Sequence, residues 1–340
     1  MATLRDWLQL FRSHTSPLEM IITIAGSALA VGTVWDVKVL LFLIFGWLYH
    51  NGGYGHNSAE DFIQGFDRDD PHKSHHPLQR GVLDPYLARG TCILLIMVSF
   101  FYGAIISGFA LLPLAVLILL TGMGFLYNIF GKRIGSKFIP IAIAHSLLLP
   151  FAYFGSGGVL ELQEGFPYVT NDLGAVMLIA FLYLVFQIIY QIMVEGDLKD
   201  IDMDEASFLK TLGVWVEDGE FRSSPTARSF SLIIKSASIA GLFWILIILE
   251  AEAWYYLALI ILSLAMVVQD HRLMGSRKWD HGRCVKDMAL MEVLSTFALL
   301  LSFSSVAGGW TAFLVVVLIN IGYFVMMNRF LWGTLMKPKV

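Results

Sequence analysis

The chain has 340 residues, of which 57% are hydrophobic and 15% charged, and its formal net charge at pH 7 is −4. This composition excludes an ordinary soluble domain, and the small negative charge gives no indication of a nucleic-acid partner. The two cysteines, Cys92 and Cys284, fall in an apolar stretch and in a polar loop, so no disulfide framework is indicated.

The N-terminal stretch from Leu4 to Arg12 is polar and amphipathic. It shows no cleavable signal peptide, and it is typical of a segment that lies along a membrane surface. Apolar stretches near the length that crosses a bilayer follow it. We predict ten spans, near residues 18–34, 38–60, 88–110, 112–130, 139–156, 173–196, 230–250, 253–271, 288–307 and 310–328. No linker divides them, so the sequence predicts a single membrane domain over residues 1–340.

The basic residues predict which side of the membrane each loop faces. If the N-terminus is cytoplasmic, the cytoplasmic segments and their helix ends hold all but two of the 23 lysines and arginines. The exceptions are Lys38 on the far side and Lys235 within the seventh span. Because basic residues accumulate on the cytoplasmic side, we expect the N-terminus and both acidic loops described below to be cytoplasmic.

An acidic cluster follows the second predicted span. Asn57 and Asp61 stand one helical turn apart and share a face, and Asp67 follows them. Carboxylates are expensive near hydrocarbon, which favours a functional reason for the cluster. The basic residues Lys73 and Arg80 come shortly after it.

The fourth predicted span ends in a further basic element, which contains Tyr127, Lys132 and Arg133. Taken alone, this element is typical of a basic anchor with an interfacial aromatic ring. Together with the acidic clusters, it also fits a site that binds an anion.

A second acidic cluster follows the sixth span, and Lys210 comes after it. At about 100° per residue, a helix places Asp197, Asp200 and Asp204 within an arc of roughly 60°, with Asp202 on the other side. Oxygen-rich faces of this kind suit Mg²⁺, which often binds through a few carboxylates and substrate phosphates. The alternative is that the acids cap helices at the aqueous boundary.

These clusters resemble the two motifs of the UbiA superfamily of intramembrane prenyltransferases. That family carries Asn-x-x-x-Asp-x-x-x-Asp after its second span and an Asp-x-x-x-Asp type of motif after its sixth. The residues that fill them here are Asn57, Asp61 and Asp67 in the first motif and Asp197, Asp200 and Asp204 in the second. The third acid of the first motif comes two residues late, after Gly65, a form most like the menaquinone-biosynthesis branch.

Shorter stretches extend the resemblance. Lys210 begins a basic-Thr-Leu sequence, and Tyr127 with Lys132 is similar to the family's Tyr/Lys pair with one extra residue between them. Residues 76–81 resemble the family's Arg-Pro-Leu-x-x-Gly, but His76 stands in place of the phosphate-binding arginine.

The resemblance implies an all-α, polytopic membrane helix bundle around a central cavity. It implies a nine-helix core over about residues 10–307 and an additional C-terminal span at about 310–328. It further implies an enzyme that uses two or more Mg²⁺ ions to move an isoprenoid chain from its diphosphate to a lipophilic or aromatic acceptor, in contact with membrane lipid.

The resemblance also implies roles for individual residues. The metal ligands would be Asn57, Asp61, Asp67, Asp197, Asp200 and Asp204. The diphosphate would be bound by Lys73, Arg80, Lys132, Arg133 and Lys210. The residues expected to take part in catalysis are Asp61, Tyr127, Lys132 and Asp197. An aromatic ring, from Tyr49, Tyr54 or Tyr190, would shield the carbocation by cation–π contact, with packing as the alternative role.

Other functions remain open on sequence grounds. A membrane terpene cyclase of the same superfamily ionises the same kind of substrate and closes the chain on itself. A cation- or proton-coupled transporter also uses intramembrane carboxylates, but it would place them near the middle of the membrane and not beside basic loops. A structural membrane scaffold is the remaining alternative, and the sequence identifies neither the acceptor, the prenyl chain length nor the oligomeric state.

Overall fold

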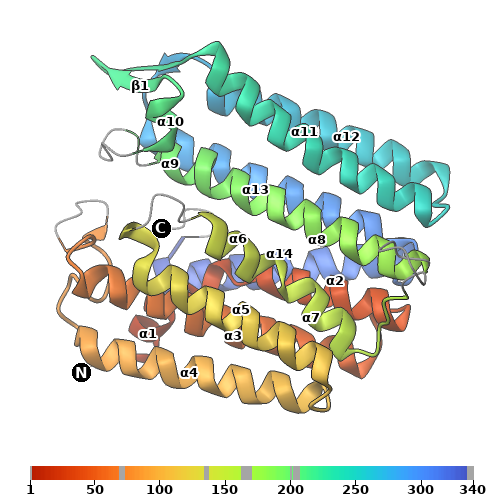
Figure 1. The fold of residues 1–340 in the computed structure, drawn as a ribbon. Helices are drawn as coiled ribbons and strands as arrows, with labels where there is room; N and C mark the ends of the chain where they lie inside the picture. Colours follow the sequence, from red (N-terminus) through yellow and green to blue (C-terminus); the bar gives the residue numbers. More distant parts are fainter. Residues whose placement is uncertain are drawn as a thin grey trace. The chain divides into compact units, whose positions relative to one another are not determined.

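The computed structural model describes residues 2–68, 73–133, 138–161, 171–199, 201 and 207–334. In these residues the chain is almost entirely helical, which confirms the predicted all-α membrane bundle (Figure 1). The chain forms two compact units. The first unit comprises Met1–Val159 and Val306–Val340, and the second comprises Leu160–Ser305.

The first unit is a bundle that contains the first acidic cluster. Its elements are α1 (Leu4–Leu10), η1 (Ser13–Thr15), α2 (Pro17–Val31), α3 (Val37–Ile63), α4 (Pro85–Ile106), α5 (Leu111–Phe130), η3 (Gly131–Arg133), α6 (Phe138–Ser146), α7 (Leu148–Gly155) and α14 (Gly309–Trp332). Helix α3 packs against α2, α4 and α5, which lie alongside it in Figure 1. Helices α2 and α7 touch closely at Gly26, where a Cβ atom would clash with the carbonyl oxygen of Leu149. Small residues at such crossings let helix backbones approach within a membrane.

The N-terminal helix α1 fastens other parts of the first unit together. Arg5 and Gln9 donate hydrogen bonds to the carbonyl oxygen of Leu331, near the end of α14. Asp6 and Gln9 are buried, and both accept from Arg80 of the loop after α3. The additional C-terminal helix is therefore an integral part of the first unit.

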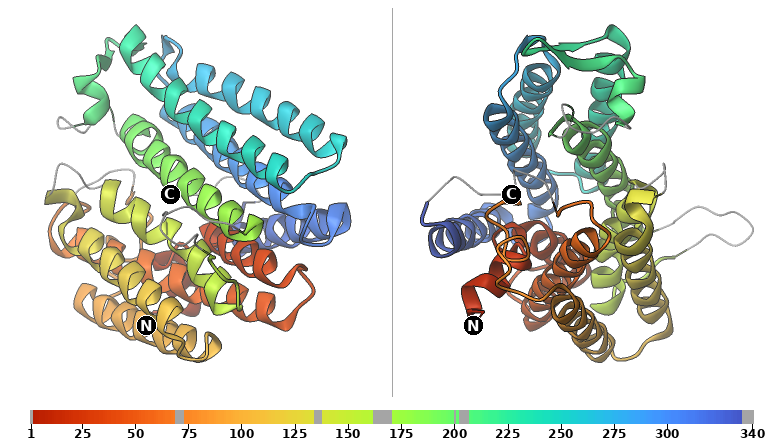
Figure 2. Two further views of the ribbon diagram at one scale, coloured as in Figure 1. Left: turned by 45° about the vertical axis from the view of Figure 1, so that its right-hand side comes forward. Right: turned by 90° about the vertical axis from the view of Figure 1, so that its left-hand side faces the viewer.

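The second unit is a helical bundle with a small sheet at one end (Figure 2). Its elements are α8 (Asp172–Tyr190), the π-helical η4 (Gln191–Gly196), α9 (Asp197–Lys199), α10 (Phe208–Thr211), β1 (Val214–Glu217), β2 (Glu220–Ser223), α11 (Pro225–Ile248), α12 (Ala253–Met274), β3 (Arg277–Lys278) and α13 (His281–Ser304). The antiparallel order is β1-β2-β3, with Val214 opposite Ser223 and Glu220 opposite Lys278. The sheet was not predicted, although Asp218-Gly219 is a strong hairpin signal; both residues have the positive φ of a tight turn, 50° and 73°.

Helices lie at all ten predicted spans. Seven segments are long and apolar enough to cross a membrane by length and composition: Pro85–Ile106, Leu111–Phe130, Phe138–Gly155, Asp172–Lys199, Pro225–Ile248, Ala253–Met274 and Gly309–Trp332. Helix α2, with 15 residues, is too short for that group, and α3 and α13 also lie outside it. The fifth span is divided at Leu147 into α6 and α7, because Pro150 has no amide hydrogen to continue the helical ladder.

Candidate active site

The first motif lies at the C-terminal end of α3. The Asn57 amide donates to Oδ2 of Asp61 over 3.2 Å, which confirms that the two side chains share a face. Gly65 then takes a left-handed conformation, with φ of 92°, and reverses the chain. The Asp67 amide N–H consequently returns to the carbonyl oxygen of Asp61, at 3.3 Å. The two additional residues of this motif thus form a turn that brings its third acid back to its second.

The loop after α3 places one predicted basic residue beside the motif and another elsewhere. Lys73 forms an ion pair with Asp67 over 2.7 Å, so its charge lies at the motif. Arg80 instead binds Asp6 and Gln9 of α1, each over 2.8 Å. Its guanidinium therefore has a structural role in this state of the protein.

The end of α5 is held beside the same part of α3. Gln64 donates to the carbonyl oxygen of Ile129 over 3.1 Å. Asn128 donates to the carbonyl oxygen of Gly53 over 3.1 Å, and this asparagine within an apolar helix was not singled out from the sequence. These bonds place the partly buried Tyr127 on the turn that precedes Ile129.

The basic residues after Tyr127, Lys132 and Arg133, belong to η3. Arg133 is exposed at the end of η3. The Lys132 side chain lies outside the described part of the structure. Its predicted contact with diphosphate therefore stays a prediction.

The second motif begins with Asp197, in the second unit. Its Oδ2 accepts from the amide N–H of Phe208 over 2.6 Å and from the Ser207 hydroxyl over 3.1 Å. These contacts cap the start of α10, which carries the partly buried Lys210. Asp197 therefore acts as a helix cap, which was the alternative to metal binding. The cap uses only Oδ2, and its other carboxylate oxygen, Oδ1, takes no part in it.

The other members of the second motif, Asp200 and Asp204, lie outside the described residues, as does Asp202. The predicted shared face of the cluster is therefore not tested. Directly before Asp197, however, the helix widens into the π-helical turn η4. Such π-helical turns are rare in proteins, and those that do occur often lie at functional sites. This turn rotates the motif relative to α8, which a uniform 100° per residue would not predict.

A buried polar cluster in the second unit surrounds Lys235. The Lys235 ammonium is fully buried, donates to Oε1 of Gln187 over 2.7 Å and lies 3.7 Å from the ring centre of Tyr190. The Tyr190 hydroxyl donates to Asp270 over 2.7 Å. The sequence signal for this cluster was Lys235 itself. A lysine within an apolar span needs polar partners around its charge, so it indicates a buried polar cluster.

These contacts bear on the aromatic residues predicted to shield a carbocation. One face of the Tyr190 ring is covered by Lys235, and Tyr49 is buried, stacks on Phe45 and donates to a backbone carbonyl. Both therefore have packing roles. Tyr54 is only partly buried and stacks on His50, with ring centres 4.3 Å apart.

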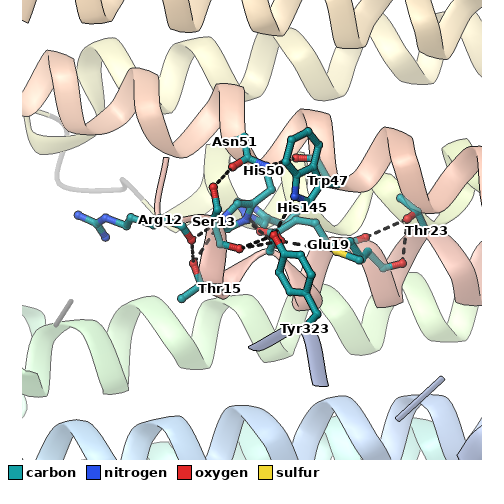
Figure 3. A network of polar contacts seen from close by, with 12 residues as sticks. Arg12, Ser13, Thr15, Glu19, Thr23, Trp47, His50, Asn51, His145 and Tyr323 are labelled. Carbon is teal, nitrogen blue, oxygen red and sulfur yellow. Dashed lines mark hydrogen bonds and ion pairs between the residues drawn. The ribbon is translucent and has the colours of Figure 1, made fainter. Parts of the chain in front are cut away.

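A second buried network, in the first unit, was not predicted (Figure 3). Nδ1 of His50 lies 2.7 Å from one carboxylate oxygen of Glu19, and Nε2 of His145 lies 3.1 Å from the other. The second ring nitrogen of His50 lies 3.2 Å from the carbonyl oxygen of Arg12. The network joins α2, α3 and α6. On α3, His50 stands seven residues before Asn57, which is nearly two full turns and therefore the same face.

The donor atoms of the first motif fit a hard cation. The motif offers an amide oxygen and two carboxylates, which are the oxygen ligands that Mg²⁺ prefers. Within the described ranges, no three His, Cys, Asp or Glu side chains form a group arranged to hold a metal ion. Of the three acids of the second motif, only Asp197 lies within those ranges.

Comparisons with known proteins bear on the family and the fold of this chain. A family model described as the UbiA prenyltransferase family matches residues 20–291. A solved structure of digeranylgeranylglyceryl phosphate synthase has 18% sequence identity and a TM-score of 0.59, and the match covers 89% of this chain and 98% of that one. A UbiA homologue from Archaeoglobus fulgidus bound to GPP and Mg²⁺ has 14% identity and a TM-score of 0.54, covering 88% and 99%. The same homologue has also been solved with DMAPP and Mg²⁺, at 14% identity and a TM-score of 0.55. No curated protein matches the chain. At these identities the solved structures establish a shared fold.

Proposed function

Since the chain belongs to the UbiA prenyltransferase family, we propose that it moves an isoprenoid chain from its diphosphate to a lipophilic or aromatic acceptor, with Mg²⁺ as cofactor. The protein is a multi-pass integral membrane prenyltransferase. The observation that carries the finer proposal is the turn at the end of α3. There Asn57, Asp61 and Asp67 gather oxygen donors, and Lys73 adds a positive charge.

Bound Mg²⁺ would neutralise negative charge on the diphosphate. The proposed ligands are Asn57, Asp61, Asp67, Asp197, Asp200 and Asp204. During transfer the allylic C–O bond breaks and its electron pair leaves with the diphosphate oxygen. Lys73 lies beside Asp67 and lowers the energy of the charge that develops on that oxygen. Lys132, Arg133 and Lys210 are proposed to add to this positive field.

The acceptor then forms a bond to the allylic carbon with its own electron pair and loses a proton. Tyr54 is the aromatic ring that we propose faces the carbocation, because Tyr49 and Tyr190 are committed to packing. The relative bound to GPP and DMAPP with Mg²⁺ supports a prenyl diphosphate as the donor here.

The function is tested with radiolabelled prenyl diphosphates and purified protein in detergent. We expect label to move into a lipid-soluble product only when Mg²⁺ and an acceptor are both present, and chelation with EDTA to stop the transfer reversibly. A cyclic hydrocarbon formed without acceptor would identify a terpene cyclase instead. Absence of turnover across donors of different chain length and acceptors of different classes would reject the proposal.

Asp197 allows capping and metal binding to be separated. Asparagine caps helices about as well as aspartate but is a weaker ligand for Mg²⁺. We therefore expect Asp197→Asn to keep the wild-type melting temperature and to raise the Mg²⁺ concentration for half-maximal activity by at least about tenfold. Asp197→Ala should also remove the cap and thereby lower the free energy of unfolding by about 1 kcal/mol. Wild-type Mg²⁺ dependence in Asp197→Asn would restrict Asp197 to its capping role.

We also propose that the N-terminus and both acidic loops are cytoplasmic, from the distribution of basic residues. The test is labelling of single cysteines in oriented vesicles, on a background that lacks the buried Cys92 and Cys284. Ser74→Cys and Thr211→Cys should react from the cytoplasmic side and Val159→Cys from the other; all three positions are exposed. If the first two reacted from opposite sides, the two motifs could not act on one diphosphate.

A further inference from the structure

Arg12 has an unusual backbone conformation. It lies between α1 and η1 with φ of 51° and ψ of 38°, the left-handed region that residues other than glycine seldom adopt. This conformation turns its carbonyl group inward, where the oxygen accepts from the Thr15 hydroxyl over 2.8 Å and lies 3.2 Å from Nε2 of His50. The guanidinium points away from this network, as Figure 3 shows. Such strain is frequent at functional sites.

The guanidinium of Arg12 has no anionic partner among the residues that the structure describes. It is only partly exposed, yet none of the residues that the structure describes forms a hydrogen bond or an ion pair with it. Neighbouring arginines differ in this respect, because Arg5 binds the carbonyl of Leu331 and Arg80 binds Asp6. The backbone thus holds a positive charge in a fixed place that these residues do not neutralise.

That place is next to the loop that follows the first motif. Packing agrees with this placement, because Leu10, two residues before Arg12, forms one buried cluster with Ala59 of α3 and Leu78 of this loop. Burial, and next to it the positive charge of Arg12, lower the pKa of His76 to about 3. His76 is consequently uncharged at neutral pH, and its buried Nε2 has no hydrogen-bond partner among the described residues. His76 therefore supplies no positive charge beside the motif, whereas Arg12 does.

A further buried side chain in this region lacks partners. His14 is fully buried, and neither of its ring nitrogens has a hydrogen-bond partner in the described part of the chain. The charge of Arg12 acts on this ring as well. Buried polar groups are nearly always hydrogen-bonded, so the unsatisfied nitrogens of His14 and His76 indicate that a further polar group binds in this region.

We propose that Arg12 binds the diphosphate of the prenyl substrate beside the first motif and supplies there the positive charge that His76 lacks. This inference rests on the proposed function and assigns a new residue to its site. A guanidinium presents paired N–H donors that match the oxygens of a phosphate group, which a neutral imidazole does not.

The test replaces Arg12 without disturbing its turn. Asparagine tolerates the left-handed conformation better than most residues, so Arg12→Asn removes the charge and keeps the backbone. The matched control is Arg222→Asn, at an exposed position of β2. The probe is inorganic pyrophosphate with Mg²⁺, titrated calorimetrically into the full-length protein in detergent. Loss of a charge-assisted contact should weaken its binding by about ten- to 150-fold in Arg12→Asn and leave it unchanged in Arg222→Asn.

Two further measurements distinguish binding from folding. The ligand-free melting temperature of Arg12→Asn should equal or exceed that of the wild type, and Arg12→Lys, which keeps the charge, should bind pyrophosphate more tightly than Arg12→Asn. Unchanged affinity in Arg12→Asn, or a weakened affinity accompanied by a lower ligand-free melting temperature, would overturn the inference alone. Failure of the wild type both to bind pyrophosphate and to turn over prenyl diphosphates would overturn the proposed function with it.

Discussion

Replacing Asp61 with alanine is expected to lower kcat/KM for the prenyl diphosphate by at least about 100-fold, or about 2.7 kcal/mol of transition-state stabilisation. The Asp61 carboxylate is buried at the turn that also holds Asn57 and Asp67, so its loss removes a central ligand. A metal that neutralises developing charge contributes several kcal/mol. The measurement is initial rate at varied prenyl diphosphate concentration and saturating Mg²⁺.

The fold should survive this substitution. The turn is closed by the backbone carbonyl of residue 61, which receives the Asp67 amide whatever the side chain. The matched control is Glu60→Gln, on the same turn but another face, where the carboxylate lies 3.6 Å from Arg89. Its activity should remain within a few fold of the wild type. Near-normal Mg²⁺-dependent turnover in Asp61→Ala would remove Asp61 from the site.

The second large effect is expected on stability. Glu19→Ala should lower the free energy of unfolding by about 3–5 kcal/mol, because it takes the shared partner from two buried imidazoles. His50 and His145 would each keep a ring nitrogen in a buried position without the carboxylate that now faces it. Glu19→Gln keeps one acceptor oxygen and should lose less, about 1.5–3 kcal/mol. Unfolding by denaturant in mixed micelles measures both variants.

An exposed glutamate provides the control for this series. Glu252, at the start of α12, is exposed, so Glu252→Ala should change stability by no more than about 0.5 kcal/mol. Equal stability of Glu19→Ala and the wild type would show that the imidazoles find other partners, and that the network does not hold α2, α3 and α6 together.

The sequence alone was sufficient for much of the fold. Runs of apolar residues near bilayer length predicted helices at all ten positions, because backbone groups in hydrocarbon must be satisfied within the segment. The first motif was also predicted, since residues four apart on a helix share a face. The structure confirms this for Asn57 and Asp61 through their hydrogen bond. The late position of Asp67 had a local explanation in Gly65, whose freedom permits the closing turn.

Other features depended on contacts between residues far apart in the chain. Arg80 was predicted to bind diphosphate, but its guanidinium binds Asp6 and Gln9, whose position is set by the packing of α1. Glu19, His50 and His145 are separated by long apolar stretches and gave no pattern of their own. A side chain with several allowed partners takes the one that packing brings within reach.

Local propensity identified the segments, and tertiary structure selected the partners of their polar groups. The sequence determined a polytopic helical membrane protein with two acidic motifs, because helix formation and apolar length are properties of neighbouring residues. Only the folded chain decided that Asp197 caps α10, that Lys235 lies over Tyr190, and that Arg12 takes a left-handed backbone conformation. The physical reason is that a buried polar group must find a partner, and the available partners are fixed by helix packing.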